Sequence, residues 1–329
     1  MRAVVCKQWG TPADLEIADM PEPDIAQAAS GHGVRIAVKA AGVNFADTLI
    51  IAGKYQVKPE HPFSPGLEFA GEVLETAPGV TKVKPGDRVL GMTEYGAFAD
   101  QVIAEEDRLY TIPDNMDFVS AAAFAVTYGT SHLGLTRYTH LRAGETLLVH
   151  GAAGGVGLTA VEIGKRLGAK VIATAGGADK LTVPARYGAD HLIDYRAEDI
   201  RGKVLEFTDG AGVDVVYDPV GGKAFDASLR CVRFGARMLI VGFASGSIPQ
   251  IPANILLVKN VSAIGYYWGA HRKFAPQMIA DSFTELFDWY RAGELKPHVS
   301  HTLPLEQVSE ALDILLARKS TGKVVLTTG

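Results

Sequence analysis

Apolar residues in the middle of the chain occur in short unbroken runs, separated by segments in which they recur every three or four positions. The runs include LLV, VIAT, VDVVY and MLIVGF, and such runs are typical of strands covered on both faces. Strands that alternate with helices indicate right-handed crossovers and a parallel, doubly wound α/β sheet. The expected strands span 146–150, 170–175, 191–194, 213–217, 237–243 and 261–266. The expected helices span 156–167, 180–187, 200–207 and 223–231.

The two ends of the chain have a different pattern. In residues 1–119, turn signals separate short segments rich in β-forming residues, at 34–43, 69–74 and 88–92. This pattern predicts a β-rich, barrel-like domain with one short helix at 46–52. Residues 267–329 are too few to fold alone, so we expect them to return and complete the β-rich domain. Residues 120–266 would then form an inserted α/β domain.

Composition narrows the functional class. Glycine supplies 36 of 329 residues, above its usual share of about 7%, which fits many tight strand-to-helix turns. The net charge of −5 offers no basic surface for nucleic acid or anionic lipid. Two cysteines, Cys6 and Cys231, are too few for a disulfide framework or a four-cysteine zinc site. No apolar stretch is long enough for a membrane span and no signal peptide is evident, so we expect a cytoplasmic protein without nucleic-acid or membrane partners.

The strongest motif is GAAGGVG at 151–157, which follows an expected strand and opens an expected helix. This is the context that a dinucleotide pyrophosphate site requires. Glycine permits a tight turn and close backbone approach, and the helix N-terminus presents free N–H groups. Relative to the G-x-G-x-x-G template, Ala152 replaces the first glycine, whereas Gly154 and Gly157 are kept. A turn needed only for packing the helix on the strand is the alternative.

The next strand indicates which dinucleotide is bound. NAD sites usually carry Asp or Glu about twenty residues after the glycines, whereas this strand ends in Ala175, Gly176 and Gly177. Without a carboxylate a 2′-phosphate is not repelled, and Lys180 is placed to meet it. Alternatively, Lys180 is a solvated residue in the first turn of its helix. We therefore predict NADPH rather than NADH as the cofactor.

Several segments together resemble a known family: GVNFAD (42–47), FSPGLEFAGEV (63–73), VKPGDRV (83–89), GAAGGVG (151–157), IDYRAED (193–199) and STGKVVL (320–326). In this order they resemble the medium-chain dehydrogenases/reductases, and among them the zinc-independent NADPH:quinone oxidoreductases, the zeta-crystallin-like branch. The segment PANILLVKNVSAIGYYWG (252–269) is similar to a quinone oxidoreductase-like subgroup. The resemblance implies a GroES-like β-rich domain split around an inserted Rossmann domain.

The resemblance also implies cofactor contacts: Asn44 and Thr127 at the nicotinamide and its ribose, Gly154, Gly155, Val156 and Gly157 at the pyrophosphate, Lys180 and Tyr195 at the 2′-phosphate, and Arg318 closing on the cofactor. Leu49 stands at a position that is often aromatic in the family. Backbone capping in loops is the alternative role for Asn44 and Thr127.

A zinc site is not expected. Zinc-dependent relatives carry a cysteine where Asn44 stands and a histidine where Leu67 stands, and a leucine cannot bind a metal. His298 and His301 are spaced as two metal ligands could be, but no further ligands cluster with them in the sequence. Histidines on a surface strand are the simpler interpretation.

Without a metal, hydride delivery requires an acceptor that is already electron-poor, such as a quinone or an activated alkene. Tyr55 lies eleven residues after Asn44, where related enoyl thioester reductases carry a proton-donating tyrosine. We therefore predict Tyr55 and Asn44 as catalytic residues, with a role in only lining the pocket as the alternative for Tyr55. Four further aromatic residues are candidates for stacking on the acceptor, with core packing as the alternative: Tyr95, Tyr128, Tyr267 and Trp268.

The predicted function is NADPH-dependent hydride transfer to quinones. A reductase of enone or enoyl-thioester C=C bonds, or an NADPH-binding protein with little turnover, remain open. The resemblance implies a homodimer that pairs through the edge of the Rossmann sheet, at 261–266. An unpaired apolar edge strand favours such association, unless the following helix covers it.

Overall fold

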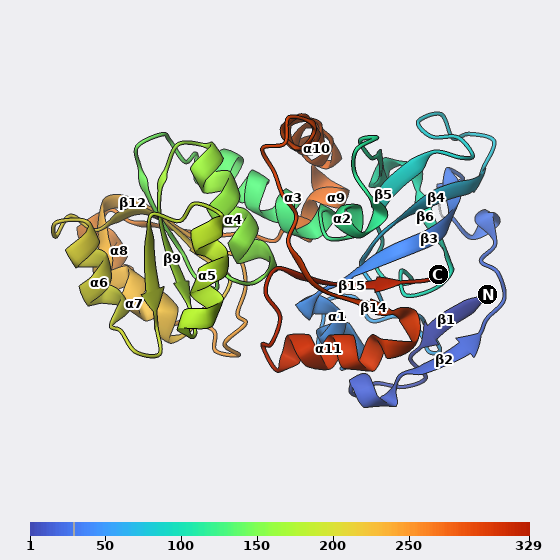
Figure 1. Ribbon diagram of the computed structural model, residues 1–329, viewed down its shortest axis with the longest axis horizontal. Coiled ribbons are helices and arrows are strands. Elements are labelled where there is room, and N and C mark those ends of the chain that lie inside the picture. Colours follow the sequence, from blue (N-terminus) through green and yellow to red (C-terminus); the bar gives the residue numbers. More distant parts are fainter. Residues whose placement is uncertain (29) are drawn as a thin grey trace. The chain divides into compact units, whose positions relative to one another are not determined.

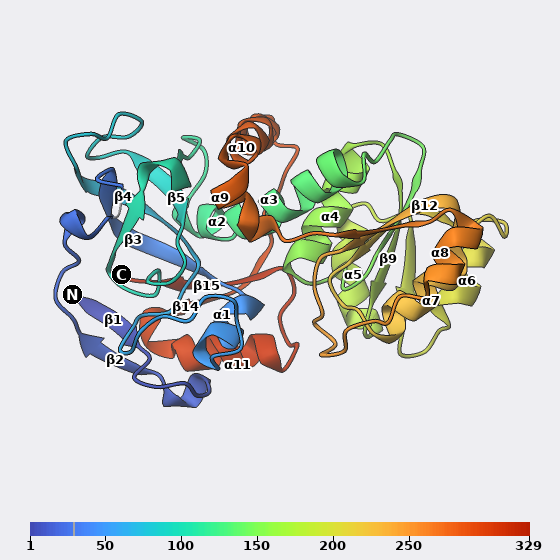
Figure 2. The same cartoon turned by 180° about the vertical axis from the view of Figure 1, so that it is seen from behind.

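The computed structural model describes residues 1–28 and 30–329, which form two compact units (Figures 1 and 2). Unit 1 comprises Met1–Val126 and Phe287–Gly329, and unit 2 comprises Thr127–Leu286. The boundaries between the units therefore lie at 126/127 and 286/287, further along the chain than the expected 119/120 and 266/267. Residues after 266 stay in unit 2 because they bond there: His271 Nε2 lies 2.8 Å from Tyr138 Oη.

Unit 2 is built on a six-stranded parallel sheet with the order β10-β9-β8-β11-β12-β13. Its strands are β8 (Thr146–Val149), β9 (Lys170–Ala175), β10 (His191–Asp194), β11 (Val213–Asp218), β12 (Val232–Ile240) and β13 (Ser262–Gly265). The first strand lies inside the sheet and the chain winds outward from it in both directions, which is the Rossmann order. The predicted doubly wound parallel sheet is confirmed.

Helices cover both faces of this sheet. They are α4 (Gly155–Arg166), α5 (Ala178–Arg186), α6 (Ile200–Phe207), α7 (Lys223–Cys231) and α8 (Ala253–Lys259). Figure 1 shows α4 and α5 on one side and α6, α7 and α8 on the other. On the second side, Leu148 and Val216 of the sheet share a buried cluster with Val204 of α6 and Phe225 of α7.

Two elements of unit 2 differ from the expectation. Helix α8 was not predicted, and β12 begins at Val232 rather than at 237. The early part of β12 does not read as a buried strand because the register shifts between Val232 and Arg237, where Gly235 adopts a φ of +76°. Such a bulge interrupts the apolar run.

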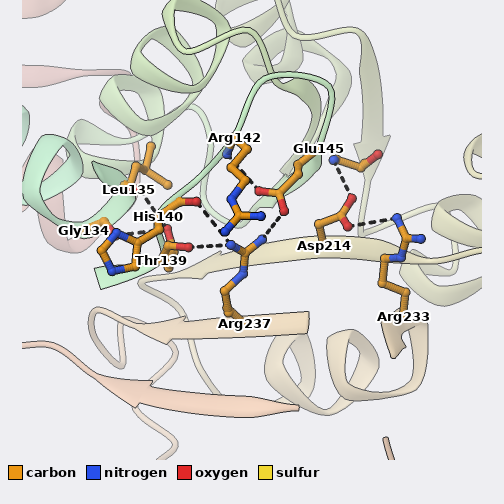
Figure 3. A network of polar contacts seen from close by, with 10 residues as sticks. Gly134, Leu135, Thr139, His140, Arg142, Glu145, Asp214, Arg233 and Arg237 are labelled. Atoms are coloured by element: carbon orange, nitrogen blue, oxygen red, sulfur yellow. Dashed lines mark hydrogen bonds and ion pairs between the residues drawn. The ribbon is translucent and has the colours of Figure 1, made fainter. Parts of the chain in front are cut away.

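Arg237 anchors the turn that leads into β8 (Figure 3). Its guanidinium donates to the carbonyl oxygens of Thr139, at 2.7 Å, and His140, at 3.2 Å, and pairs with Glu145 at 2.6 Å. Asp214 accepts a hydrogen bond from the backbone N–H of Thr146 at 2.8 Å. The network therefore fixes the start of β8, whereas the glycine motif follows the end of that strand.

The remaining helices of unit 2 and its junctions are α3 (Ala125–Leu133), which continues into a π-helical turn (Gly134–Tyr138), α9 (His271–Phe274) and α10 (Pro276–Arg291). Both α3 and α10 contain a boundary between the units.

Unit 1 is β-rich. Its main sheet has the order β14-β15-β3-β4-β5-β7, with β6 paired to β3, and β1 and β2 form a separate hairpin. The strands are β1 (Arg2–Val5), β2 (Glu16–Asp19), β3 (Gly33–Val43), β4 (Glu68–Thr76), β5 (Arg88–Met92), β6 (Gln101–Glu105), β7 (Leu109–Thr111), β14 (Val299–Pro304) and β15 (Lys323–Thr327). Its helices are α1 (Phe45–Ile51), α2 (Phe118–Ala122) and α11 (Val308–Leu316).

The returning C-terminal segment is an integral part of unit 1. Strand β15 pairs antiparallel with β3, where Val324 lies opposite Val43. Val308 and Leu312 of α11 belong to the same buried core as Ile36 of β3. Among the described residues, no helix has the length and apolar character needed to cross a membrane.

Candidate functional site

The glycine motif forms a tight turn between β8 and α4 in unit 2. Gly151 has a φ of +59°, and the N–H of Gly154, the N-cap of α4, donates to the Gly151 carbonyl at 2.9 Å. A Cβ on Gly157 would lie only 2.1 Å from the same carbonyl oxygen. The turn can therefore fold against the helix only with glycine at 157. The first N–H groups of α4 lack intrahelical acceptors and are suited to an anion.

A buried histidine supports this turn. His150 precedes Gly151, with its Nδ1 2.9 Å from Thr174 Oγ1 of β9 and its Nε2 2.6 Å from Ser228 Oγ of α7. Burial lowers the pKa of His150, against the opposing effect of Asp218. The neutral ring therefore links two strands and a helix behind the turn without adding charge.

The end of β9 forms a corner at Gly176, and the strand itself ends without an acidic residue. A Cβ on Gly176 would lie 2.5 Å from Tyr195 Oη and 3.0 Å from Arg196 Nε. Asp194, which precedes Tyr195, serves the backbone: its Oδ1 accepts from the N–H groups of Gly177 at 2.9 Å and Arg196 at 3.0 Å. Lys180 lies in the first turn of α5, which Gly177 caps. The predicted residues Lys180 and Tyr195 thus come from segments that meet at this corner.

Arg196 was missed in the sequence analysis. Its side chain is exposed, and no hydrogen bond or ion pair joins its guanidinium to any other residue that the structure describes. Arg196 follows Tyr195 in the IDYR segment, so a basic residue next to a predicted ligand was the available signal.

The other residues predicted in unit 2 differ in exposure. Thr127 is 2% exposed, and its carbonyl accepts from Thr159 Oγ1 at 3.0 Å. Tyr128 is also 2% exposed, and its hydroxyl donates to Glu162 at 2.6 Å. Tyr267 is 46% exposed. Trp268 is 7% exposed, and its Nε1 has no hydrogen-bond partner among residues 1–28 and 30–329.

In unit 1, Asn44 lies at the N-terminus of α1 beside buried charges. Its Oδ1 accepts from Lys323 Nζ at 2.8 Å, and its Nδ2 donates to Glu68 Oε1 at 2.8 Å. Lys323 and Glu68 pair at 2.6 Å, and both side chains are almost completely buried. Asp47 accepts from the Asn44 N–H at 2.7 Å, and burial raises the pKa of Asp47 to about 7.

These three charged residues were also missed. A lysine in STGKVVL and a glutamate in GLEFAG each interrupt an apolar strand, and Asp47 stands in GVNFAD. Charged residues inside buried strands are rare unless they are paired. That rarity was the signal, but nothing local in the sequence shows that positions 68 and 323 meet.

The remaining residues predicted in unit 1 lie outside this cluster. Tyr55 is partly buried and packs against the core of unit 1. Tyr95 is 42% exposed, and its ring meets that of Phe63 with centroids 5.9 Å apart. Arg318 is exposed just after α11, with a φ of +54°.

The residues present do not fit a zinc ion. In the described part of the chain, no three side chains of the His, Cys, Asp or Glu type are grouped to hold a metal. Glu68 is the acid beside Leu67, and the Lys323 ammonium already occupies its Oε1. Three oxygens surround that ammonium: Val43 O at 2.9 Å, Asn44 Oδ1 and Glu68 Oε1. A fixed positive charge there opposes a second cation.

Comparisons with known proteins agree with this architecture. Residues 30–114 match the alcohol dehydrogenase GroES-like domain, and residues 155–284 match the zinc-binding dehydrogenase family. The chain is 44% identical to "Quinone oxidoreductase-like protein 2 homolog" of Nematostella vectensis, over 99% of this chain and 89% of that protein. It is 36% identical to "Quinone oxidoreductase" of Pseudomonas aeruginosa, over 97% of each chain.

A solved structure supports the same assignment. The Escherichia coli quinone oxidoreductase complexed with NADPH superposes with a TM-score of 0.91, at 30% identity and with 100% of each chain covered. The GroES-like unit, the Rossmann unit and these similarities together place the chain in the quinone oxidoreductase family of the medium-chain dehydrogenases/reductases.

Proposed function

We propose that this protein is an NADPH-dependent oxidoreductase that transfers a hydride to quinones without a metal. The observation that carries the cofactor assignment is the corner at Gly176, where β9 ends without an acidic residue and Tyr195 and Arg196 take the space that a side chain would fill. The Asp or Glu that would select NAD at this position is absent. The NADPH complex of the Escherichia coli relative supports the same cofactor.

We assign groups of each unit to separate parts of this dinucleotide. The N–H groups of Gly155, Val156 and Gly157 would hold the pyrophosphate at the N-terminus of α4, with Gly154 as the cap. Lys180, Tyr195 and Arg196 would hold the 2′-phosphate. Asn44 and Thr127 would contact the nicotinamide end, and Arg318 would close on the cofactor. When bound, NADPH supplies the hydride.

The side chains around Glu68 limit which hydride acceptors the protein would reduce. Since the residues around Glu68 do not fit a metal ion, no Lewis acid would polarise a simple ketone. A quinone disperses the incoming charge over its own carbonyl groups and needs mainly orientation and exclusion of water. Tyr55 would supply a proton, and Tyr95 and Tyr267 would line the acceptor site. Tyr128 and Trp268 were candidates as well, but their exposures of 2% and 7% favour the alternative of core packing. The names of the similar proteins support the quinone assignment.

The proposed assembly is a homodimer paired through β13. This strand ends the sheet and, among the described strands, pairs only with β12. Leu257 and Val258, in the helix that leads to β13, are each 77% exposed. An unpaired edge beside exposed apolar residues favours association. Light scattering at micromolar concentration should give twice the chain mass, and a monomer would contradict the dimer.

The decisive experiment is NADPH oxidation against a panel of quinones, enones and enoyl thioesters, with identification of the products. Hydroquinone or semiquinone formation with the highest kcat/KM among the panel is expected. A saturated ketone or thioester as the best product would replace the quinone reductase by a C=C reductase. Tight NADPH binding without oxidation by any acceptor would indicate a binding protein.

A further inference from the structure

Four polar residues of unit 1, which we call the Lys323 cluster, lie together although they are far apart in the chain. They are Asn44, Asp47, Glu68 and Lys323. Asp47 and Glu68 are completely buried and Lys323 is 5% exposed. The cluster joins the N-terminus of α1 to strands β4 and β15.

The cluster is closely fitted. Lys323 Nζ has three protons and three acceptors, namely Val43 O, Asn44 Oδ1 and Glu68 Oε1. The second oxygen of Glu68 accepts from the Val126 N–H at 2.8 Å. A Cβ on Gly42 would lie 2.5 Å from Glu68 Oε1, so glycine at 42 leaves room for the carboxylate.

This arrangement fixes the orientation of the Asn44 amide. An ammonium can only donate, so the side-chain oxygen must face Lys323, and a carboxylate can only accept, so the side-chain nitrogen must face Glu68. The same nitrogen also donates to Gly42 O at 3.2 Å. The Asn44 backbone N–H is held by Asp47. Both protons of the amide are therefore used, and the side chain can meet a further partner only through its acceptor Oδ1.

We propose that Lys323 and Glu68 are positioning residues that lock the Asn44 amide, so that Asn44 meets the nicotinamide end of NADPH solely as a hydrogen-bond acceptor. The ligand group it recognises must then be a donor, such as the carboxamide NH₂ or a hydroxyl of the adjacent ribose. This inference rests on the proposed function, because it takes Asn44 to lie at the nicotinamide end.

The test compares two ligands that differ at that end. NADPH carries the nicotinamide ribose, whereas adenosine 2′,5′-bisphosphate carries only the groups assigned to the corner and glycine turn of unit 2. In Lys323→Met, we expect the dissociation constant of NADPH to rise at least tenfold, and that of the bisphosphate to change less than twofold. Lys323→Arg, which keeps the charge and donors, should recover most of the affinity for NADPH.

A double-mutant cycle shows whether Lys323 acts through Asn44. Asn44→Ala should show the same selective loss, and adding Lys323→Met to it should cause little further change. Lys323→Met/Glu68→Gln removes both charges while keeping a side-chain acceptor, and it serves if the single variant does not fold. The matched control is Arg237→Met, which breaks a 2.6 Å ion pair in unit 2. It should lower the melting temperature without altering the ratio of the two dissociation constants.

The outcomes separate the inference from the proposed function. If the wild-type protein binds neither ligand, the proposed function fails. If the wild type binds NADPH but Lys323→Met and the double variant bind both ligands unchanged, or lose both equally, the positioning role is overturned. Independent effects of Lys323→Met and Asn44→Ala would likewise contradict action through the amide.

Discussion

The two units contribute candidate binding groups of different kinds. Unit 2 offers main-chain N–H groups and glycines: the turn at Gly151 closes on α4 because residue 157 has no Cβ. Unit 1 offers an amide held by charged side chains that are removed from water, Lys323 and Glu68. The glycine turn of unit 2 therefore depends on the absence of a side chain, whereas the amide of unit 1 depends on the charges that its neighbouring side chains carry.

This difference has energetic consequences. A glycine in place of alanine costs about 0.5–1 kcal/mol in chain entropy, whereas each buried ion costs several kcal/mol of desolvation that its partners must offset. Backbone amides do not titrate, but Asp47 does, and burial raises its pKa to about 7. We therefore expect the glycine turn of unit 2 to be sensitive to changes in side-chain size, and the Lys323 cluster of unit 1 to be sensitive to changes in charge and pH.

The largest effect on cofactor binding should come from adding one carbon to the glycine turn. In Gly157→Ala, the new Cβ would meet the Gly151 carbonyl oxygen at 2.1 Å, so the turn must move away from α4. We expect NADPH affinity, measured by fluorescence titration, to fall about a hundredfold or more, equivalent to about 2.7 kcal/mol. Gly202→Ala, at an exposed position of α6, is the matched control, because the nearest atom to its Cβ position is Asp199 Oδ2, the end of a flexible side chain, at 3.1 Å. Equal affinities of both variants would show that the turn does not depend on shape.

Substitution of Arg196 tests whether NADPH binding by unit 2 also depends on a charged side chain. A charge-assisted hydrogen bond is worth about 1.5–3 kcal/mol, or roughly ten- to a hundredfold in affinity. Arg196→Ala should therefore weaken NADPH binding by about this factor and leave the weak binding of NADH unchanged. Arg201→Ala, which removes another exposed arginine, should affect neither ligand. A parallel loss for both nucleotides would exclude a specific contact of Arg196 with the 2′-phosphate.

The same contrast explains what could be predicted from the sequence. The glycine motif occupies consecutive positions, so its strand, turn and helix could be identified directly, and α4 begins at Gly155, one residue before the expected start. Parallel strands buried on both faces also leave a clear apolar record, and β9 and β10 match their expected bounds. A requirement on backbone shape that involves only consecutive residues can therefore be recognised from the sequence at those positions.

The Lys323 cluster could not be assembled in this way. Val43 and Lys323 are neighbours only because β15 returns to pair with β3. Before that pairing is known, Lys323 looks like one charged residue in an apolar strand. Helix α8 was missed for a related reason: its residues are half-buried or exposed, including Leu257 and Val258 at 77%, so its apolar sequence has no amphipathic face to reveal it.

The titration of Asp47 tests how much a buried charge in unit 1 costs in folding stability. In the unfolded chain an aspartate titrates near pH 3.9, whereas burial raises the pKa of Asp47 to about 7 in the fold. Below pH 4 both states are protonated and there is no penalty. As the pH rises towards 7, the unfolded state loses its proton first, and stability falls until the two states are equally ionised.

Asp47→Asn removes this titration. The variant should gain stability relative to the wild type between pH 4 and 7, by about 4 kcal/mol in total for a pKa difference of about three, and the gain should stay constant above pH 7. Urea unfolding at a series of pH values measures the difference. Asp226→Asn, at an exposed position of α7, should show no such pH dependence. A flat difference for Asp47→Asn would mean that Lys323 and the Asn44 backbone N–H compensate the charge of Asp47 completely.

The smallest effect is expected at Tyr55, which distinguishes the acceptors rather than the cofactor. A hydride added to an enone leaves a basic enolate carbon that needs a proton, whereas a quinone gives a phenolate that water can protonate. Tyr55→Phe should therefore lower kcat on enones by about tenfold, less than the roughly hundredfold or more typical of general-acid catalysis, and change kcat on quinones less than about twofold. Tyr110→Phe, on β7 of the same unit, is the control. Unchanged turnover of both acceptor classes would remove the proton-donor role and leave Tyr55 as a lining residue, in which case unit 1 would contribute positioning alone.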